Sequence, residues 1–476
     1  IRAIRWKNML SPMGYKIKFH NSLMCVFIAF LSNLGFPRSG EILQFDVNWY
    51  HNVLKLLRNW WVVQTGAVNP NARSIELKNE VMGEGVRFVA AHEVGHAIGL
   101  PHNMGSSSAY PVDSLRSKTF TKKFGTAPSI MDYARWNYVA QPGDEGVALM
   151  PSYWDTPNIG LYDKYSIKWG YKPILGVSAE EEKKILQGWI LEKQDDLTYR
   201  YGDPGIDPSS QTEDLGDNAV KASEYGIANL KRIVPNLINW TYEDGKNYDD
   251  LKELYLNVYS QFRRYIGHVS TNVGGIYENL KSNDQDGDVY THVPKNLQKK
   301  AIAFLNTHIF SSLDWLVNRD VLSKIENIGA QERVRSIQEF ALRRLFDYSR
   351  LARMLENESM NGKLAYSINE MIIDLDKSIW GDLETASPTN IYNRNLQKSY
   401  INLLIDMMEE DKKQSSYARR FGTNIDYASS DIKPIFVGKI FDLDRKIKNK
   451  IKRTRDDATS NHLKYISMQL SEFIDD

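Results

Sequence analysis

The stretch from Arg87 to Asn103, RFVAAHEVGHAIGLPHN, constrains the fold more than any other part of this 476-residue chain. His92 and His96 are four residues apart, so on a helix both side chains project from the same face. Apolar residues lead into them from Asn79 at helical spacing. The sequence therefore predicts a helix that begins at Asn79 and presents two imidazoles side by side.

The residues after this helix predict a turn that brings back a third histidine. Gly99 can adopt the left-handed conformation that ends a helix, and Pro101 prevents the helix from resuming. His102 can then face the first two histidines. Three neutral imidazoles suit zinc and leave a fourth position for water or substrate, as in catalytic zinc sites. We expect one catalytic Zn²⁺, with the ligands His92, His96 and His102.

Glu93 stands directly after the first histidine, which puts its carboxylate beside the metal and not on it. In this position it can act as the general base that takes a proton from water. Two alternatives stay open. The metal could staple a non-catalytic module whose helical region binds a partner, although the intact Glu93 argues against this. The site could also hydrolyse a bond other than a peptide bond, because the motif says nothing about the leaving group.

A second segment, PSIMDYARWNYVAQPGD (128–144), follows the histidines. HExxHxxGxxH with a downstream methionine turn resembles the metzincin zinc peptidases. The run Ser129-Ile130-Met131-Asp132-Tyr133 is similar to the turn of astacin-like and serralysin-like enzymes. With ASEYGIANLKRIVPNL (222–237), the chain from about Gly40 onward looks like the bacterial zinc-dependent metalloproteases whose C-terminal part is called the Met-zincin domain.

This resemblance implies roles for two residues of the turn. Met131 would form a hydrophobic floor beneath the metal. Tyr133 would bind the metal weakly or donate a hydrogen bond to the reacting carbonyl, and the alternative is that it is only a buried aromatic residue. The resemblance further implies a zinc endopeptidase acting on a peptide or protein substrate, and an extracytoplasmic location: periplasmic, cell-surface or secreted.

Composition limits the other partners. Lys plus Arg (60) nearly balance Asp plus Glu (59), so we expect no nucleic-acid binding. The apolar run Leu23–Leu34 is shorter than the roughly 20 residues that span a bilayer, so we expect no transmembrane segment. The single cysteine, Cys25, excludes an internal disulfide and is expected to be a buried structural thiol. Neither the oligomeric state nor a targeting signal can be predicted.

We expect an α+β fold: a metzincin-like catalytic domain over 1–172, with a long zinc-binding helix and a Met-turn, and then a mainly α-helical region over 173–476. The segment GEILQFDVNWY (40–50) alternates as a strand does, and 50–68 has helical spacing. Residues 1–38 do not resemble the family, so the substrate-binding edge strand is expected to be missing or altered. The start at Ile1 predicts a processed or truncated product.

The second half of the chain is expected to consist of helices after an irregular linker or long loop at 201–217, which is rich in Pro, Asp and Ser. No fixed-period repeat connects these helices. The expected helices cover 218–234, 248–266, 294–308, 331–356, 364–381, 390–410 and 431–455.

Overall fold

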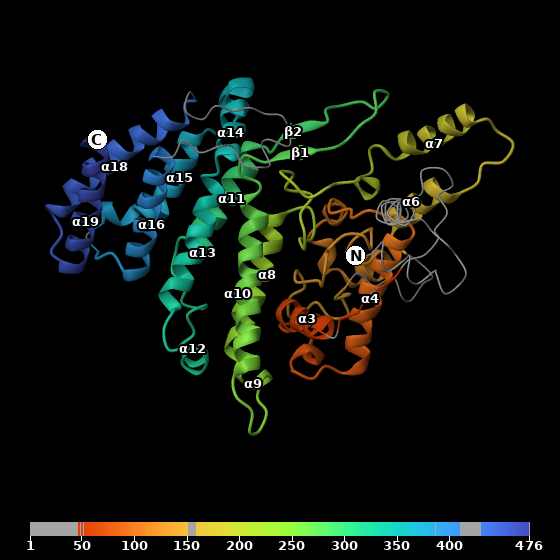
Figure 1. Ribbon diagram of the computed structural model, residues 1–476, viewed down its shortest axis with the longest axis horizontal. Coiled ribbons are helices and arrows are strands. Elements are labelled where there is room, and N and C mark those ends of the chain that lie inside the picture. Colours follow the sequence, from red (N-terminus) through yellow and green to blue (C-terminus); the bar gives the residue numbers. More distant parts are fainter. Residues whose placement is uncertain are drawn as a thin grey trace, which may run out of the picture.

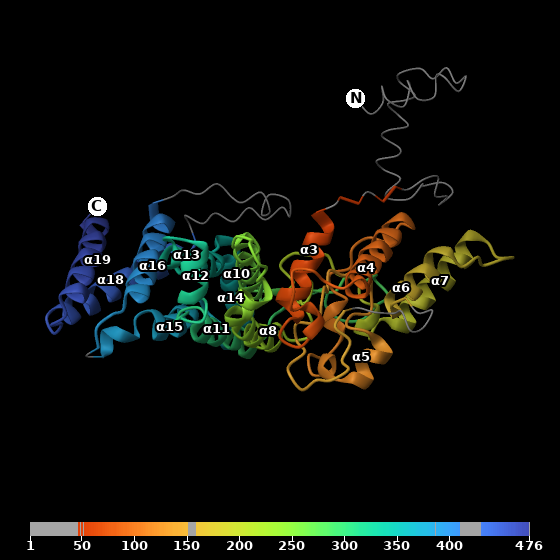
Figure 2. The same ribbon diagram turned by 90° about the horizontal axis from the view of Figure 1, so that it is seen from below.

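The computed structural model describes residues 46–47, 49–50, 52–150, 159–385, 387–409 and 430–475. Most of these residues are helical. The histidine-bearing part lies at one end of the molecule and the C-terminal helices lie at the other, with further helices side by side between them (Figure 1), and the view from below agrees (Figure 2). The predictions for Cys25, for the apolar run 23–34 and for residues 1–38 fall outside the described residues.

The histidine-bearing part consists of short helices joined by irregular segments. The helix expected from Asn79 is confirmed as α4 (Asn79–Ala97). The helix expected over 50–68 is α3 (Asn52–Trp60), which continues into a π-helical turn, η2 (Trp61–Thr65). The other elements are η3 (Pro70–Ala72), η4 (Ser107–Ala109), η5 (Ser114–Arg116), α5 (Lys118–Phe124), α6 (Leu161–Tyr171), α7 (Ala179–Lys193) and η6 (Leu197–Tyr199).

The strands of the expected α+β fold are not found where the sequence placed them. Of the segment 40–50, the described residues 46, 47, 49 and 50 form no strand, and the others lie outside the described part. Tyr50 is 75% exposed and Trp49 is 40% exposed, so no buried face selects strand geometry here. The one sheet among the described residues is an antiparallel pair, β1 (Ile276–Glu278) and β2 (Tyr290–His292), within the region expected to be helical.

The helices expected after residue 217 are confirmed, with one division. The helix expected over 331–356 is two helices, because the Asp347 carboxylate accepts a hydrogen bond from the Arg350 amide at 3.1 Å and so begins a new helix. The elements of this region are α8 (Ala219–Ile233), η7 (Val234–Asn236), α9 (Leu237–Trp240), α10 (Asp249–Ser270), α11 (Lys295–His308), α12 (Arg319–Ile325), α13 (Ala330–Leu345), α14 (Tyr348–Asn361), η8 (Gly362–Leu364), α15 (Ile368–Ile379), η9 (Gly381–Glu384), α16 (Ile391–Glu409), α18 (Ile432–Ile451) and α19 (Asp457–Asp475).

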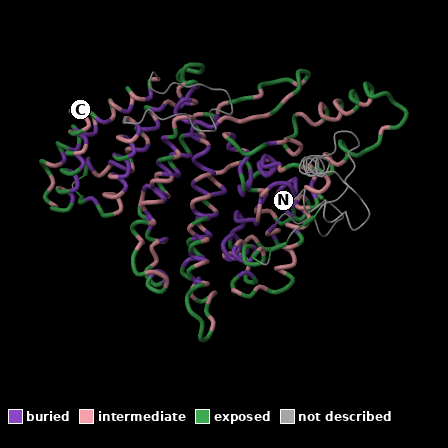
Figure 3. Tube along the Cα trace, in the orientation of Figure 1, coloured by how far each residue is buried: buried purple, intermediate pink, exposed green. Residues whose placement is uncertain are grey.

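Buried residues follow the facing sides of these helices (Figure 3). One large apolar cluster runs through them and includes both Val139, before residue 172, and Ala222, after it. A second, smaller cluster lies beneath α4 and contains Trp61, Phe88 and Met131. The division into domains at residue 172 stays a prediction.

The segment 201–217 has the irregular backbone that the sequence predicts. Many of its side chains are buried, including Asp207, Glu213 and Leu215, so it packs into the molecule along much of its length. No helix in the described ranges is both long enough and apolar enough to cross a membrane.

Candidate metal centre

The C-terminal end of α4 forms the predicted turn. Gly99 has a φ of +88°, the left-handed region that favours glycine, and its amide donates to the His96 carbonyl at 3.0 Å. The Leu100 amide reaches back to the Gly95 carbonyl at 3.0 Å, which closes the last turn. The chain then passes through Pro101, leaves the helix axis and presents the next side chain to the helix face.

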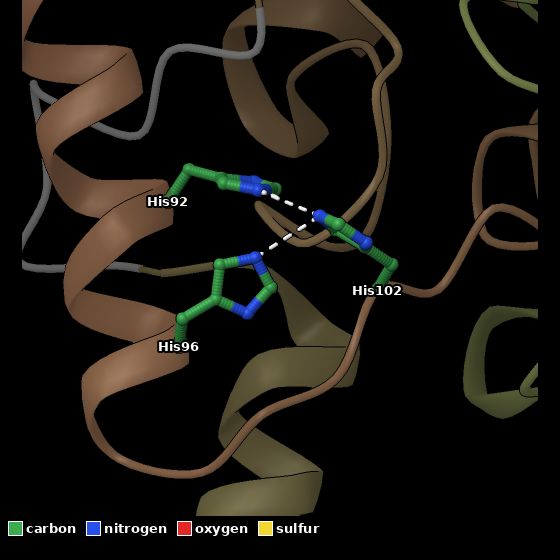
Figure 4. Close-up of side chains that lie close together, drawn as sticks. All are labelled: His92, His96 and His102. Carbon is green, nitrogen blue, oxygen red and sulfur yellow. Dashed lines mark hydrogen bonds between the residues drawn. The ribbon is translucent and has the colours of Figure 1, made fainter. Parts of the chain in front are cut away.

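The three histidines converge on one point, as predicted (Figure 4). The Nε2 atom of His102 lies 3.2 Å from Nε2 of His92 and 3.0 Å from Nε2 of His96. His92 is buried, and the other two are partly buried. The same three residues form the one group of His, Cys, Asp or Glu side chains in the described part of the chain that could hold a metal ion.

Backbone carbonyls fix the orientation of two of the rings. The Nδ1 atom of His92 lies 2.7 Å from the Ile130 carbonyl oxygen, and Nδ1 of His96 lies 2.9 Å from that of Leu100. Because a carbonyl only accepts, each Nδ1 carries the proton and donates it, which leaves the Nε2 lone pair free for a metal. Burial lowers the pKa of His92 to about 4 and also lowers that of His102, so both imidazoles are neutral at pH 7, as ligation requires.

These distances fit a tetrahedral zinc ion. Two Zn–N bonds of about 2.0–2.1 Å at the tetrahedral angle separate their nitrogens by about 3.3 Å. The observed separations of 3.0 and 3.2 Å lie close to that value. The donor set of three imidazole nitrogens is also one that zinc prefers.

Met131 lies directly against the helix face that carries the histidines. Its side chain is fully buried, and a Cβ atom placed on Gly95 would come within 2.3 Å of its sulfur. Glycine at position 95 therefore allows the methionine to pack against α4 at the residue directly before His96. This position agrees with the predicted hydrophobic floor, and the role itself stays a prediction.

A buried carboxylate from α6 holds the methionine turn. Asp163 accepts hydrogen bonds from the Ser129 hydroxyl at 2.7 Å, from the Ile130 amide at 2.9 Å and from the Gly160 amide at 3.1 Å. Burial raises the pKa of Asp163, and these three bonds oppose the rise. The turn thus keeps the Ile130 carbonyl in place for His92.

Asp132 and Asn103 tie the same turn to the segments around it. The Asp132 carboxylate accepts from the Ser107 amide at 2.7 Å and from the Ser106 hydroxyl at 3.0 Å, and burial raises its pKa to about 7. The backbone amide of Asn103 donates a hydrogen bond to the Met131 carbonyl at 3.1 Å. Its side chain bonds two backbone groups of the segment 200–202, one as donor and one as acceptor. Sequence reasoning missed these anchors, and the only available signal was their position next to the motifs.

Tyr133 and Glu93 lie at the edge of the histidine cluster. The Tyr133 ring centre lies 4.6 Å from that of His102 and 5.2 Å from that of His92. Burial raises the pKa of Tyr133, the Arg135 charge opposes this rise, and the Glu93 carboxylate adds to it. Glu93 itself is partly exposed on α4.

Arg135 packs against the face of the Tyr133 ring. Its guanidinium lies over the Tyr133 ring, 4.4 Å from the centre, and over the Trp60 ring at 4.0 Å. Its Nε lies 3.4 Å from the Glu213 carboxylate. Arg135 and Glu213 have φ values of +53° and +65°, the two such non-glycine residues in the described ranges. Such strained backbone persists only where the surroundings enforce it, and it gathers at functional sites.

The sequence model of one protein family, described as Met-zincin, matches residues 74–387. The chain belongs to the Met-zincin family. This confirms the resemblance, over a narrower span than the one expected from about Gly40 to the end. The Met-zincin match includes the histidine helix, the methionine turn and much of the helical region. Searches of curated proteins and of solved structures found no match.

Proposed function

We propose that this protein is a zinc-dependent endopeptidase. The observation that carries the proposal is the convergence of the three imidazoles, with Nε2 of His102 within 3.2 Å of the other two Nε2 atoms and a glutamate directly after the first histidine. Membership of the Met-zincin family supports the metal and the substrate class. A zinc ion bound by His92, His96 and His102 would supply Lewis acidity toward water and the scissile carbonyl.

The chain's own residues would carry the protons. Glu93 is partly exposed on α4 and directly follows His92, and its carboxylate would take a proton from the attacking water and pass it to the leaving amine. Tyr133, whose raised pKa keeps the phenol protonated, can donate a hydrogen bond to the carbonyl oxygen as negative charge develops there. Arg135 and Trp60 would hold the phenol at that position.

The test is the substitution Glu93→Gln, which keeps the size of the side chain and removes the base. We expect the variant to retain one zinc per chain by metal analysis, while casein hydrolysis falls by about 10²–10⁴-fold. Wild-type hydrolysis should be abolished by a chelator and restored by zinc. Equal hydrolysis by wild type and variant would refute the role of Glu93.

The same assays separate the two alternatives. A non-catalytic zinc module would bind zinc and cleave nothing, whereas a hydrolase of another bond would cleave esters and leave peptides intact. We also propose an extracytoplasmic location, which rests on the family resemblance alone. Immunodetection of the native protein in cell fractions would test it.

A further inference from the structure

A groove rich in arginine runs along α10 and α13, beside the segment 204–206. It consists of two adjoining cavities of 650 and 360 Å³, which share Arg263, Arg344 and Phe340. We call it the arginine groove. Its lining includes Arg263, Arg264, Arg343, Arg344, Arg350 and Arg353.

The charge of the arginine groove differs from that of the whole chain. Six arginines face two carboxylates, Glu339 and Asp347, whereas the chain as a whole carries a net charge of +1. The arginine groove is therefore a local concentration of positive charge in a nearly neutral protein, which attracts anionic ligands.

Two of the arginines hold the C-terminal end of α10. Arg350 is buried and donates to the backbone carbonyls of Ser270 and Val273. Arg344 donates to the hydroxyls of Ser270 and Thr271, each at 2.8 Å. Arg350 thus satisfies carbonyls at and just after the end of the helix, and Arg344 binds the hydroxyls there, so both residues have a structural role.

Two further arginines of the groove, Arg343 and Arg263, do not take part in the contacts at the end of α10. Arg343 is exposed and has no hydrogen-bond or ion-pair partner among the residues that the structure describes. Arg263 lies over the Phe340 ring at 4.3 Å and, within the same described part, makes no ion pair. Their guanidinium groups are thus available to a ligand in the arginine groove.

A short series of contacts joins the arginine groove to the metal centre. The Nε atom of Arg264 lies 3.0 Å from the Glu213 carboxylate, which also pairs with Arg135 beneath Tyr133. Tyr133 in turn packs against His102. An extended peptide that follows this series of contacts could reach both the metal centre and the arginine groove.

We propose that the arginine groove binds an acidic segment of the substrate, several residues away from the bond that is cleaved. This rests on the proposed function, and it names a substrate class: proteins with clustered Asp or Glu near the cleavage site. Guanidinium groups pair with carboxylates through two parallel hydrogen bonds. The hydroxyls of Ser336 and Ser349 can meet the amides of a peptide, and the contacts that join the arginine groove to the proposed peptidase site favour a peptide over a nucleic acid.

A binding experiment tests the arginine groove without relying on cleavage. Zinc-loaded full-length protein is titrated into a labelled peptide with four glutamates, and into the same peptide with glutamines in their place. We expect the glutamate peptide to bind about tenfold tighter, and the double variant Arg263→Gln/Arg343→Gln to bring the two within about threefold. The control is Arg445→Gln, an exposed arginine on α18 paired with Asp442, which should keep the difference.

Three results would overturn the proposal. The first is that the two peptides bind equally. The second is that the double variant keeps the preference while its melting temperature matches that of the wild type. The third is that oligothymidylate binds more tightly than the glutamate peptide and loses this affinity in the double variant. A cleavage assay tests the acidic-peptide site separately from the proposed peptidase function. Peptides with the acidic cluster should show a lower KM and the same kcat, and the double variant should remove the difference. If the wild type cleaves no peptide, the proposed function fails. The peptide titration still shows whether the arginine groove binds an acidic peptide.

Discussion

Two buried side chains, Asp163 and Phe262, show how differently the two parts of the molecule are held together. Asp163 accepts three hydrogen bonds from an irregular segment beside the metal centre. Phe262 lies on α10, is fully buried and packs edge-on against Trp315 at 5.1 Å. Asp163 thus accepts hydrogen bonds from backbone amides, whereas Phe262 fills apolar space.

The difference follows from the backbone. Inside a helix each amide finds its partner within the helix, so α10 needs only an apolar face to dock. In an irregular segment the amides need other acceptors, and a buried amide without a partner is costly. Asp132, Asp163 and Asn103 provide partners around the methionine turn. We therefore expect substitutions in the helical part to change stability, and substitutions near the turn to change the metal site as well.

The largest effect is expected from Phe262→Ala. Removal of a fully buried ring should lower the free energy of unfolding by about 3–5 kcal/mol, measured by chemical denaturation. Zinc affinity of the folded protein should be unchanged. The control is Phe441→Ala on α18, whose ring is 53% exposed and which should cost under about 1 kcal/mol. A loss of zinc affinity in the folded Phe262→Ala variant would contradict the expectation that the helical part affects stability alone.

The next effect concerns the pH dependence of stability. Burial lowers the pKa of His268 to about 4, and its Nε2 lies 2.9 Å from the Thr212 carbonyl, so this residue joins α10 to the segment 201–217. The unfolded chain binds a proton near pH 6.5, before the folded chain does. The stability from neutral His268 is thus present above pH 6.5 and is lost as the pH falls to 4, by up to about 3 kcal/mol.

The variant His268→Gln should show a smaller loss. The comparison is made on metal-free protein, so that release of metal does not contribute, with unfolding followed at pH 7 and pH 4.5. Equal losses for wild type and His268→Gln would show that this residue does not link the two parts in the way proposed.

A smaller loss of stability is expected from Asp163→Asn, with a clear effect on the metal. The amide can no longer accept all three bonds, so we expect about 2 kcal/mol of destabilisation and about a tenfold loss of zinc affinity, measured by chelator competition. The control is Asp196→Asn, since Asp196 is exposed and caps a short turn at the Thr198 amide. If zinc affinity falls equally in both variants, the anchoring of the turn is not the cause.

The smallest effect on stability is expected from Gly95→Ala. The new Cβ would collide with the Met131 sulfur, so the methionine must move, at a cost of about 1 kcal/mol. Because this sulfur packs against α4 at the residue before His96, zinc affinity should fall too. Gly83→Ala on the same helix meets nothing within 4 Å and should stabilise the helix slightly. Equal zinc affinities in the two variants would contradict the packing role of Met131.

How much could be predicted depends on the range of the interactions. The helix from Asn79, the turn at Gly99 and the return of His102 were predicted because each depends on residues within one or two turns of the chain. The α7 helix was not predicted, although Ser178 and Glu181 form a capping box, which is a local signal of the same kind. The strand expected over 40–50 was wrong for its described residues, because alternation predicts a strand only where a sheet buries one face.

The sequence alone determined that three histidines gather at one place, since the spacing of His92, His96 and His102 is a property of the helix and its glycine. It also determined most of the helical boundaries, because apolar periodicity and capping residues act locally. Only the tertiary structure decided what supports this site. Asp163 lies far along the chain from His92, whose partner Ile130 it binds, and Glu213 lies far from Arg135, so no local rule predicts these contacts. The arginine groove has the same origin, because it forms only where α10, α13 and α14 meet.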